Sequence, residues 1–286
     1  MLVYNRQTKK LHREDEYGET TLRFLYSTVL GRFLLKLIVA RPFFSRLRAK
    51  YQRSPKSKKD ILPFALKYHI DMAEYEEAYT CFNDFFIRKR AIENHSETGD
   101  LVAVADSKLL VYKIDENLKV NVKHSCYTLQ EILNRKINIE SFRDGYCLVF
   151  RLSVSDCHRY YFIDDGMYLK RYRVKGLLHT IRPIAGKYRV FCRNQREVSY
   201  LKTENLGNII WVEVGALLVG CIQNHPQKHF KKMEEKGYFE YGGSTILVFL
   251  RNNVKIDEDI LKNSKKQIET KVKIGERIGK IIDSCN

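Results

Sequence analysis

A short glycine-serine stretch near the C-terminus constrains this chain most. Gly242 and Gly243 stand directly before Ser244 and Thr245, and β-forming residues follow at 246–250. Paired glycines allow strained backbone conformations without a Cβ clash, and they leave the Gly243 carbonyl unshielded beside the Ser244 hydroxyl. Such a hydroxyl can attack the carbonyl and move the acyl group from nitrogen to oxygen. The same residues are also typical of a hairpin turn that enters a buried strand.

Five segments, taken in chain order, decide between these two interpretations. They are residues 155–160 (S-D-C-H-R-Y), 177–185 (L-L-H-T-I-R-P-I-A), 194–198 (N-Q-R-E-V), 212–220 (V-E-V-G-A-L-L-V-G) and 236–245 (K-G-Y-F-E-Y-G-G-S-T). Together they resemble the phosphatidylserine decarboxylases, a family of pyruvoyl-dependent enzymes, although Arg182 stands where asparagine is usual. The resemblance runs from about residue 4 to residue 250.

The resemblance implies self-cleavage between Gly243 and Ser244. In that family the serine of a G-S-T motif becomes a covalent pyruvoyl group, so the expected cofactor is pyruvate formed from Ser244. The mature protein would be a heterodimer of its own cleaved α and β chains, which comprise residues 1–243 and residues 244–286. A pyruvoyl group forms a Schiff base with the substrate amine and accepts the electrons released with CO2. The implied reaction converts phosphatidylserine to phosphatidylethanolamine.

Asp106 is the expected catalytic carboxylate. Residues 102–109 (V-A-V-A-D-S-K-L) are similar to the family's S-P-A-D-G-K segment and align Asp106 with its catalytic aspartate. Val104 replaces the usual proline and Ser107 the usual glycine. An aspartate in a turn between two strands is the alternative interpretation of this residue.

His158 is the expected catalytic imidazole, since residues 155–159 resemble the family's D-Y-H-R segment. Histidine is the natural proton carrier near neutral pH. Many members carry a second histidine three residues later that is assigned to self-cleavage, but this chain has Tyr161 there. Either His158 performs both tasks, or His179, a possible supporting residue, substitutes as the self-cleavage base.

The charge of the chain predicts an anionic membrane surface as a partner. Lysine and arginine outnumber aspartate and glutamate by 51 to 34, which gives a net charge of +17. No zinc-finger, RNP or helix-turn-helix pattern favours nucleic acid, whereas basic residues bind anionic lipid with about 1 kcal/mol each. We therefore expect a peripheral protein on the cytoplasmic side of the cell membrane, and no nucleic-acid partner.

Cysteine and histidine spacing predicts neither disulfides nor a metal site. The seven cysteines are scattered without a C-x-x-C pair, which indicates a reducing compartment. His225 and His229 are four residues apart but lack an H-E-x-x-H pattern. The N-terminus shows no signal peptide.

The fold class expected is α+β, with a helical, membrane-associating N-terminal region (1–98) and a mainly antiparallel β catalytic domain (99–286). Apolar residues recur at helical spacing over 19–47, interrupted by Arg32, Lys36 and Arg41. Central charges are costly inside a bilayer, so this helix either lies in the membrane interface or packs on the protein's own core. Residues 82–90 resemble the family's F-N-E-F-F-x-R segment and should pack the helical part onto the catalytic part.

Finer expectations follow from local patterns. Residues 1–18 are predicted to be an irregular arm, and residues 272–279 to close a sheet edge. Further helices are predicted at residues 58–68, 71–79 and 128–133. Strands are predicted at residues 109–114, 118–122, 146–152, 167–174, 188–192, 198–203, 209–214 and 245–250.

Two other functions stay open at this point. A pyruvoyl-dependent decarboxylase of a soluble amino acid would be favoured if the N-terminal helix did not bind lipid. A non-catalytic basic β-rich binding module would be favoured if the chain did not cleave itself.

Overall fold

The computed structural model describes residues 2–14, 18–72, 78–89, 97, 99–122, 125–135, 137–217, 221–240 and 244–282. Its centre is a ten-stranded sheet in which every neighbouring pair is antiparallel except β1 and β17. In sheet order the strands are β13 (His229–Phe230), β9 (Gly166–Val174), β10 (Arg196–Thr203), β11 (Asn208–Val214), β15 (Ser244–Leu250), β7 (Tyr146–Leu152), β4 (Ser107–Lys113), β17 (Glu269–Val272), β1 (Leu2–Asn5) and β2 (Lys10–Arg13). The predicted mixed α and β class with a mainly antiparallel sheet is confirmed.

Both faces of the central strands are buried. Ile246 and Val248 of β15 enter one hydrophobic core, and Leu247 and Phe249 enter the other. Successive side chains of a strand point to opposite faces, so a strand between two cores is apolar at most of its positions. This is why β15, β7 and β11 were predicted correctly.

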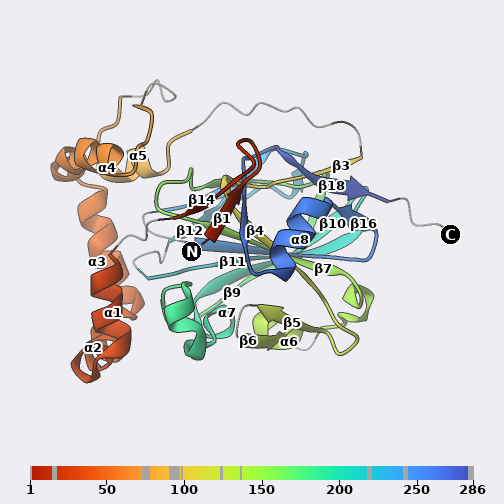
Figure 1. Ribbon diagram of the computed structural model, residues 1–286, viewed down its shortest axis with the longest axis horizontal. Helices are drawn as coiled ribbons and strands as arrows, with labels where there is room; N and C mark the ends of the chain where they lie inside the picture. Colours follow the sequence, from red (N-terminus) through yellow and green to blue (C-terminus); the bar gives the residue numbers. More distant parts are fainter. Residues whose placement is uncertain are drawn as a thin grey trace.

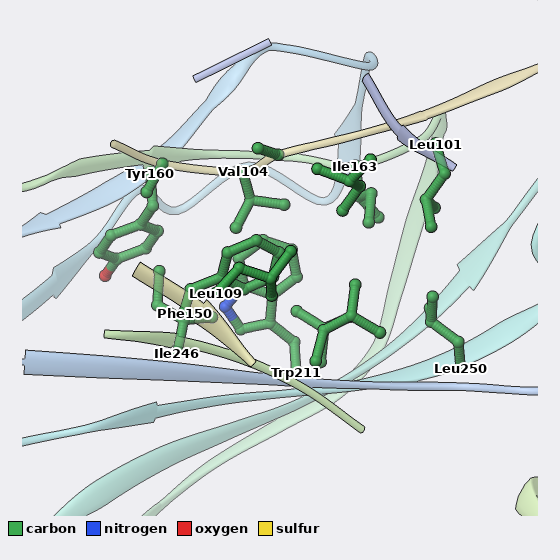
Figure 2. Close-up of a cluster of buried hydrophobic side chains, with 14 of the residues drawn as sticks. Leu101, Val104, Leu109, Phe150, Tyr160, Ile163, Trp211, Ile246 and Leu250 are labelled. Carbon is green, nitrogen blue, oxygen red and sulfur yellow. The ribbon is translucent and has the colours of Figure 1, made fainter. Parts of the chain in front are cut away.

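Two smaller sheets cover the first face. They consist of β12 (Ile222–Asn224), β14 (Glu235–Phe239) and β8 (Arg159–Tyr161), and of β16 (Val254–Ile256), β18 (Arg277–Ile281) and β3 (Asp100–Val102). Figure 2 shows the core between the layers, where Tyr160, Val104 and Ile163 lie over Phe150, Trp211 and Ile246. Helix α8 (Glu258–Lys265), which was not predicted, adds Ile260 to this core.

Short helices and a hairpin cover the second face. They are α6 (Leu129–Leu133), η5 (Pro183–Tyr188), α7 (Val190–Arg193), and the pair β5 (Lys119–Val122) and β6 (Ser125–Thr128). Helix α6 confirms the prediction at 128–133, because Thr128 caps it and Glu131 completes a capping box. The strand predicted at 188–192 is wrong. Arg189 there has a φ of 49°, which starts a helix instead of continuing a strand.

The N-terminal helices form a column beside the sheets (Figure 1). The single helix predicted over 19–47 is wrong. The chain forms α1 (Glu19–Ser27), α2 (Val29–Leu34), the π-helix η1 (Leu35–Val39) and α3 (Pro42–Gln52). Thr28 is extended and caps Gly31, and Arg41 is extended before Pro42, so the backbone restarts twice.

The predicted helix at 58–68 begins as η2 (Pro55–Asp60) and continues as α4 (Ile61–Lys67), and α5 (Phe82–Phe86) follows. The helix predicted at 71–79 falls largely outside the described residues. We call residues 19–67 the helical arm and the set of sheets with their covering helices the β body. None of the described helices has the length and apolar character to span a membrane.

The two chain ends meet in the large sheet, which corrects two predictions. Residues 1–18 are not wholly irregular, because β1 and β2 form a hairpin and β1 pairs with β17. Residues 272–279 do not close an edge, since β17 lies between β4 and β1, and β18 lies between β16 and β3. Pairings between distant segments leave no local pattern in a sequence. The division between residues 98 and 99 stays a prediction.

Candidate functional site

The register of the large sheet brings the predicted site segments to one end. Ser244, the first residue of β15, lies opposite Leu152, the last residue of β7. One pair further into the sheet, Lys108 of β4 and Thr245 of β15 flank the same residue, Arg151. Strands lie about 4.8 Å apart, so the start of β4 is roughly 10 Å from the start of β15. Asp106 directly precedes β4 and therefore lies at this end too.

Asp106 is held in a turn that joins three parts of the β body. Its Oδ1 accepts a hydrogen bond of 2.9 Å from the Ile274 backbone N–H. Within the same turn, the Val104 carbonyl accepts from the Tyr161 N–H at 2.9 Å. Asp106 is buried, and after burial itself its charge is the next cause of the raised pKa of Cys157. The Asp106 carboxylate therefore lies near Cys157, the residue before His158.

His158 follows a tight turn at the end of β7. The Asp156 carboxylate closes this turn by accepting from the Ser153 N–H at 2.7 Å, and it pairs with Lys108 Nζ at 2.7 Å. The His158 Nδ1 lies 2.9 Å from the Asp156 carbonyl oxygen, which can only accept. We therefore assign the proton to Nδ1, which leaves Nε2 as the basic nitrogen.

The last residue of α5 and the residues that follow it contact the loop that carries His158. The rings of Phe86 and His158 have centroids 4.0 Å apart, and His158 is fully buried. Arg88 donates to the Ser155 carbonyl at 2.7 Å, and Arg159 donates to the Ile87 carbonyl at 2.7 Å. The prediction that residues 82–90 pack onto the catalytic part is therefore correct. The resemblance had marked this segment but not the contact with His158.

Tyr161 replaces the second histidine and does not supply a base. Its hydroxyl lies 3.5 Å from Glu235 Oε2. Burial, the nearby Cys157 and Glu235 raise the Tyr161 pKa far above its usual value. The hydroxyl therefore keeps its proton at neutral pH.

His179 lies on the other side of Ser244, at the same end of the sheet. Asn194 Nδ2 donates to the carbonyls of both His179 and Gly215, each at 2.8 Å, and Gly215 directly follows β11. The Tyr26 oxygen accepts from the Thr180 N–H at 2.9 Å, so its own proton can go to His179 Nδ1, 3.2 Å away. The family resemblance at residues 194–198 marked this segment, but not the hydrogen bonds by which Asn194 joins His179 to Gly215.

The electrostatics of His179 favour its neutral form. Burial, followed by the charge of Arg193, lowers its pKa to about 4. Its ring stacks on Tyr188 with centroids 4.4 Å apart. A histidine of such low basicity is a weak proton acceptor near neutral pH.

A pocket adjoins the site on the second face of the sheet. Thr245, Arg151 and Glu269 lie at its polar side, and its other lining residues are mostly apolar: Leu110, Val122, Ser125, Tyr127, Val149, Ile181, Arg182, Gly186, Val190 and Phe191. Arg151 pairs with Glu269 and, at 2.7 Å, with Glu14. In the part of the chain that the structure describes, no group of three or more histidine, cysteine or acidic side chains is placed to hold a metal ion.

Comparison with known proteins gives consistent matches. A profile of the family described as phosphatidylserine decarboxylase matches residues 82–280. The chain is 50% identical to phosphatidylserine decarboxylase proenzyme 2 of Clostridium acetobutylicum, over 98% of this chain and 99% of that one. It is 40% identical to the phosphatidylserine decarboxylase proenzymes of Clostridium kluyveri, over 96% of this chain and 97% of that one, and of Clostridium tetani, over 97% of both chains.

Proposed function

Because the chain belongs to the phosphatidylserine decarboxylase family, we propose that it converts phosphatidylserine to phosphatidylethanolamine and CO2 with a pyruvoyl group made from its own Ser244. The protein is a carboxy-lyase in proenzyme form. Beyond membership of the family, we propose the pyruvoyl cofactor, the cleavage between Gly243 and Ser244, and a membrane-binding surface.

One observation carries the proposal. Ser244 begins the central strand β15, and the turns with Asp106 and His158 lie at the same end of the sheet. These are the residue types that the chemistry needs: a hydroxyl nucleophile, a base and a carboxylate. The residues therefore fit a pyruvoyl group at position 244, which would supply an electron sink for decarboxylation.

Self-cleavage requires a proton acceptor for the Ser244 hydroxyl. We assign this task to His158, since its Nδ1 proton is directed to the Asp156 carbonyl and Nε2 is basic. As the Ser244 oxygen attacks the Gly243 carbonyl carbon, the peptide C–N bond breaks and the acyl group moves to oxygen. β-Elimination then releases the carboxyl end of Gly243, and hydrolysis of the resulting dehydroalanine releases ammonia. Asp106 stabilises the protonated imidazole.

His179 is the weaker candidate for the base. Its pKa near 4 lowers its basicity, and its Nδ1 accepts from Tyr26. We assign it a supporting role in holding residues 178–180 beside β11.

The helical arm is the proposed membrane-binding surface. Its exposed apolar side chains include Val29 at 78%, Phe43 at 74% and Leu66 at 68% exposure. Exposed basic residues lie among them: Arg32 of α2, Lys36 of η1, Arg41 directly before α3, and Arg46 of α3. Apolar side chains among basic ones suit anionic lipid, which supports peripheral attachment at the cytoplasmic side of the cell membrane.

Intact mass and activity test the proposal together. Purified wild-type protein should consist of two chains with the break between Gly243 and Ser244. The fragment of residues 244–286 should resist Edman degradation, because a pyruvoyl terminus has no free amine. Ser244→Ala should stay uncleaved and inactive, whereas Ser244→Cys keeps a nucleophile. An uncleaved wild-type chain that decarboxylates phosphatidylserine would overturn the pyruvoyl assignment.

The same measurements separate the rival assignments. His158→Ala should stay uncleaved and Asp106→Asn should cleave slowly, while His179→Ala should still cleave. The reverse histidine pattern would transfer the base to His179. Activity on free serine but not on phosphatidylserine vesicles would favour the soluble amino acid decarboxylase.

A further inference from the structure

An ion pair joins the end of the helical arm to the strand that leads into the cleavage site. Arg53 directly follows α3, and its Nη2 donates to Glu240 Oε2. Glu240 directly follows β14, and its side chain is only 8% exposed. The partners are 187 residues apart in the sequence, so no local pattern predicts their contact.

The same guanidinium contacts a second segment of the site. Arg53 Nη2 also lies 3.6 Å from Cys221 Sγ, and the Glu240 N–H donates to the Cys221 carbonyl at 3.1 Å. Residues 215–220 connect β11 to Cys221, and residues 241–243 connect Glu240 to β15. Arg53 therefore contacts Cys221, where the connection from β11 ends, and Glu240, where the connection to β15 begins.

We propose that Arg53 is a positioning residue for self-cleavage, acting through Glu240. The inference rests on the proposed function, because it concerns the same Gly243–Ser244 bond. Ser244 is fixed at one end of the connection by β15, and Arg53 helps to fix Glu240 at the other. Gly242 and Gly243 allow many backbone conformations. A connection held at both ends samples fewer of them, so the conformer that brings the Ser244 hydroxyl to the Gly243 carbonyl is populated more often.

The burial of Glu240 indicates that this ion pair helps to fix the end of β14. Fully exposed ion pairs contribute little, because water and salt screen them. Here the Glu240 carboxylate is almost completely withdrawn from water, although 47% of the Arg53 side chain is exposed. Loss of Arg53 would leave a nearly buried carboxylate without this partner. The end of β14 would then be freer to move away from its present place.

A charge exchange tests the inference by the rate of cleavage. The chain is made by cell-free translation, and the appearance of fragment 244–286 is followed by mass spectrometry during a chase. Arg53→Glu and Glu240→Arg should each cleave about tenfold more slowly, equivalent to about 1.4 kcal/mol in the barrier. The double variant restores an opposite-charge pair and should recover most of the wild-type rate. Lys50→Glu makes the same charge change at an exposed position of α3 and should cleave normally.

The possible results distinguish a failure of the Arg53 positioning role from a failure of the proposed function. Single variants that cleave at the wild-type rate, or a double variant no faster than the slower single one, would overturn the positioning role. A wild-type chain that does not cleave at all would instead overturn the proposed function. Glu240→Gln, which keeps the shape of the side chain, replaces Glu240→Arg if circular dichroism shows that the latter misfolds. It should also slow cleavage.

Discussion

At the scale of single residues, His179 joins the helical arm to the site through its neutral ring. Tyr26 of α1 bonds its Nδ1, and Tyr188 stacks on its face. Protonation would place a charge in this buried contact, close to the positive charge of Arg193. The side chain therefore acts as a structural connector whose protonation state affects stability.

A pH dependence of stability follows from this. The His179 pKa falls from 6.5 to about 4 on folding. Between these values the unfolded chain binds a proton that the folded chain lacks, so the free energy of unfolding decreases as the pH falls from 6.5 toward 4. His179→Gln lacks this contribution, and its stability should fall less between pH 7 and pH 5. Urea unfolding of both chains in the uncleaved Ser244→Ala background measures the difference, and an equal fall in both chains would contradict it.

At the scale of elements, the helical arm is divided between two environments. Leu25 and Tyr26 of α1 pack into the second core of the β body. Val29, Phe33, Phe43 and Leu47 are instead exposed. The sequence left open whether the helix at 19–47 packs on the protein or lies in the membrane. Packing on the protein is confirmed for Leu25 and Tyr26, and attachment of the exposed side chains to a membrane stays a proposal.

Lipid binding should depend on these exposed side chains. Replacing Phe43 and Leu47 by serine removes apolar area that would enter the lipid, at about 25 cal/mol per Å². The double variant should co-sediment with phosphatidylserine-containing vesicles at least about tenfold more weakly, a change of about 1.4 kcal/mol. Leu169→Ser removes an exposed leucine of β9 in the β body and serves as the control. Equal loss of binding in the control, or none in the double variant, would exclude the arm as the binding surface.

The sequence predicted elements better than it predicted contacts. The strands β7, β11 and β15 were readable because each is rich in apolar residues that alternate between two cores, although Arg151 interrupts β7 and Glu213 interrupts β11. The arm was read as a single helix, although Thr28 and Pro42 carry recognisable breaking signals. The hairpin of β1 and β2 was missed because β1 pairs with β17 at the opposite end of the chain.

In the candidate site, too, the sequence predicted the residues but not their contacts. Asp106, His158 and Ser244 were identified through family resemblance, and the sheet register places their segments at one end. The residues that support the histidines, Tyr26 and Phe86, come from the helical part. Their contacts arise only from the tertiary fold, so residue spacing held no signal for them.

At the scale of the whole molecule, the proposed cleavage site divides a chain whose two parts are interleaved. Strand β15 lies between β11 and β7, and β17 lies between β4 and β1. Residues 244–286 thus supply two interior strands of a sheet whose other strands come from residues before the cut. Arg6 adds ion pairs to three later carboxylates, with Asp257 and Glu276 at 2.9 Å and Asp259 at 2.8 Å.

The fragment of residues 244–286 should therefore stay bound after cleavage, as a heterodimer that separates only on unfolding. Release would strip β15 of its hydrogen bonds on both edges and expose side chains of both cores, which costs far more than the free energy of a weak complex. Cleaved protein should elute as one species on gel filtration at nanomolar concentration and separate only in denaturant. Arg6→Ala leaves three carboxylates close together without their shared cation, so it should lower the denaturant midpoint for release, by about 1 kcal/mol in stability. Arg23→Ala removes an exposed ion pair to Glu19 within α1 and should leave that midpoint unchanged. If the fragment dissociated on simple dilution, the central position of β15 would not be what holds the two chains together.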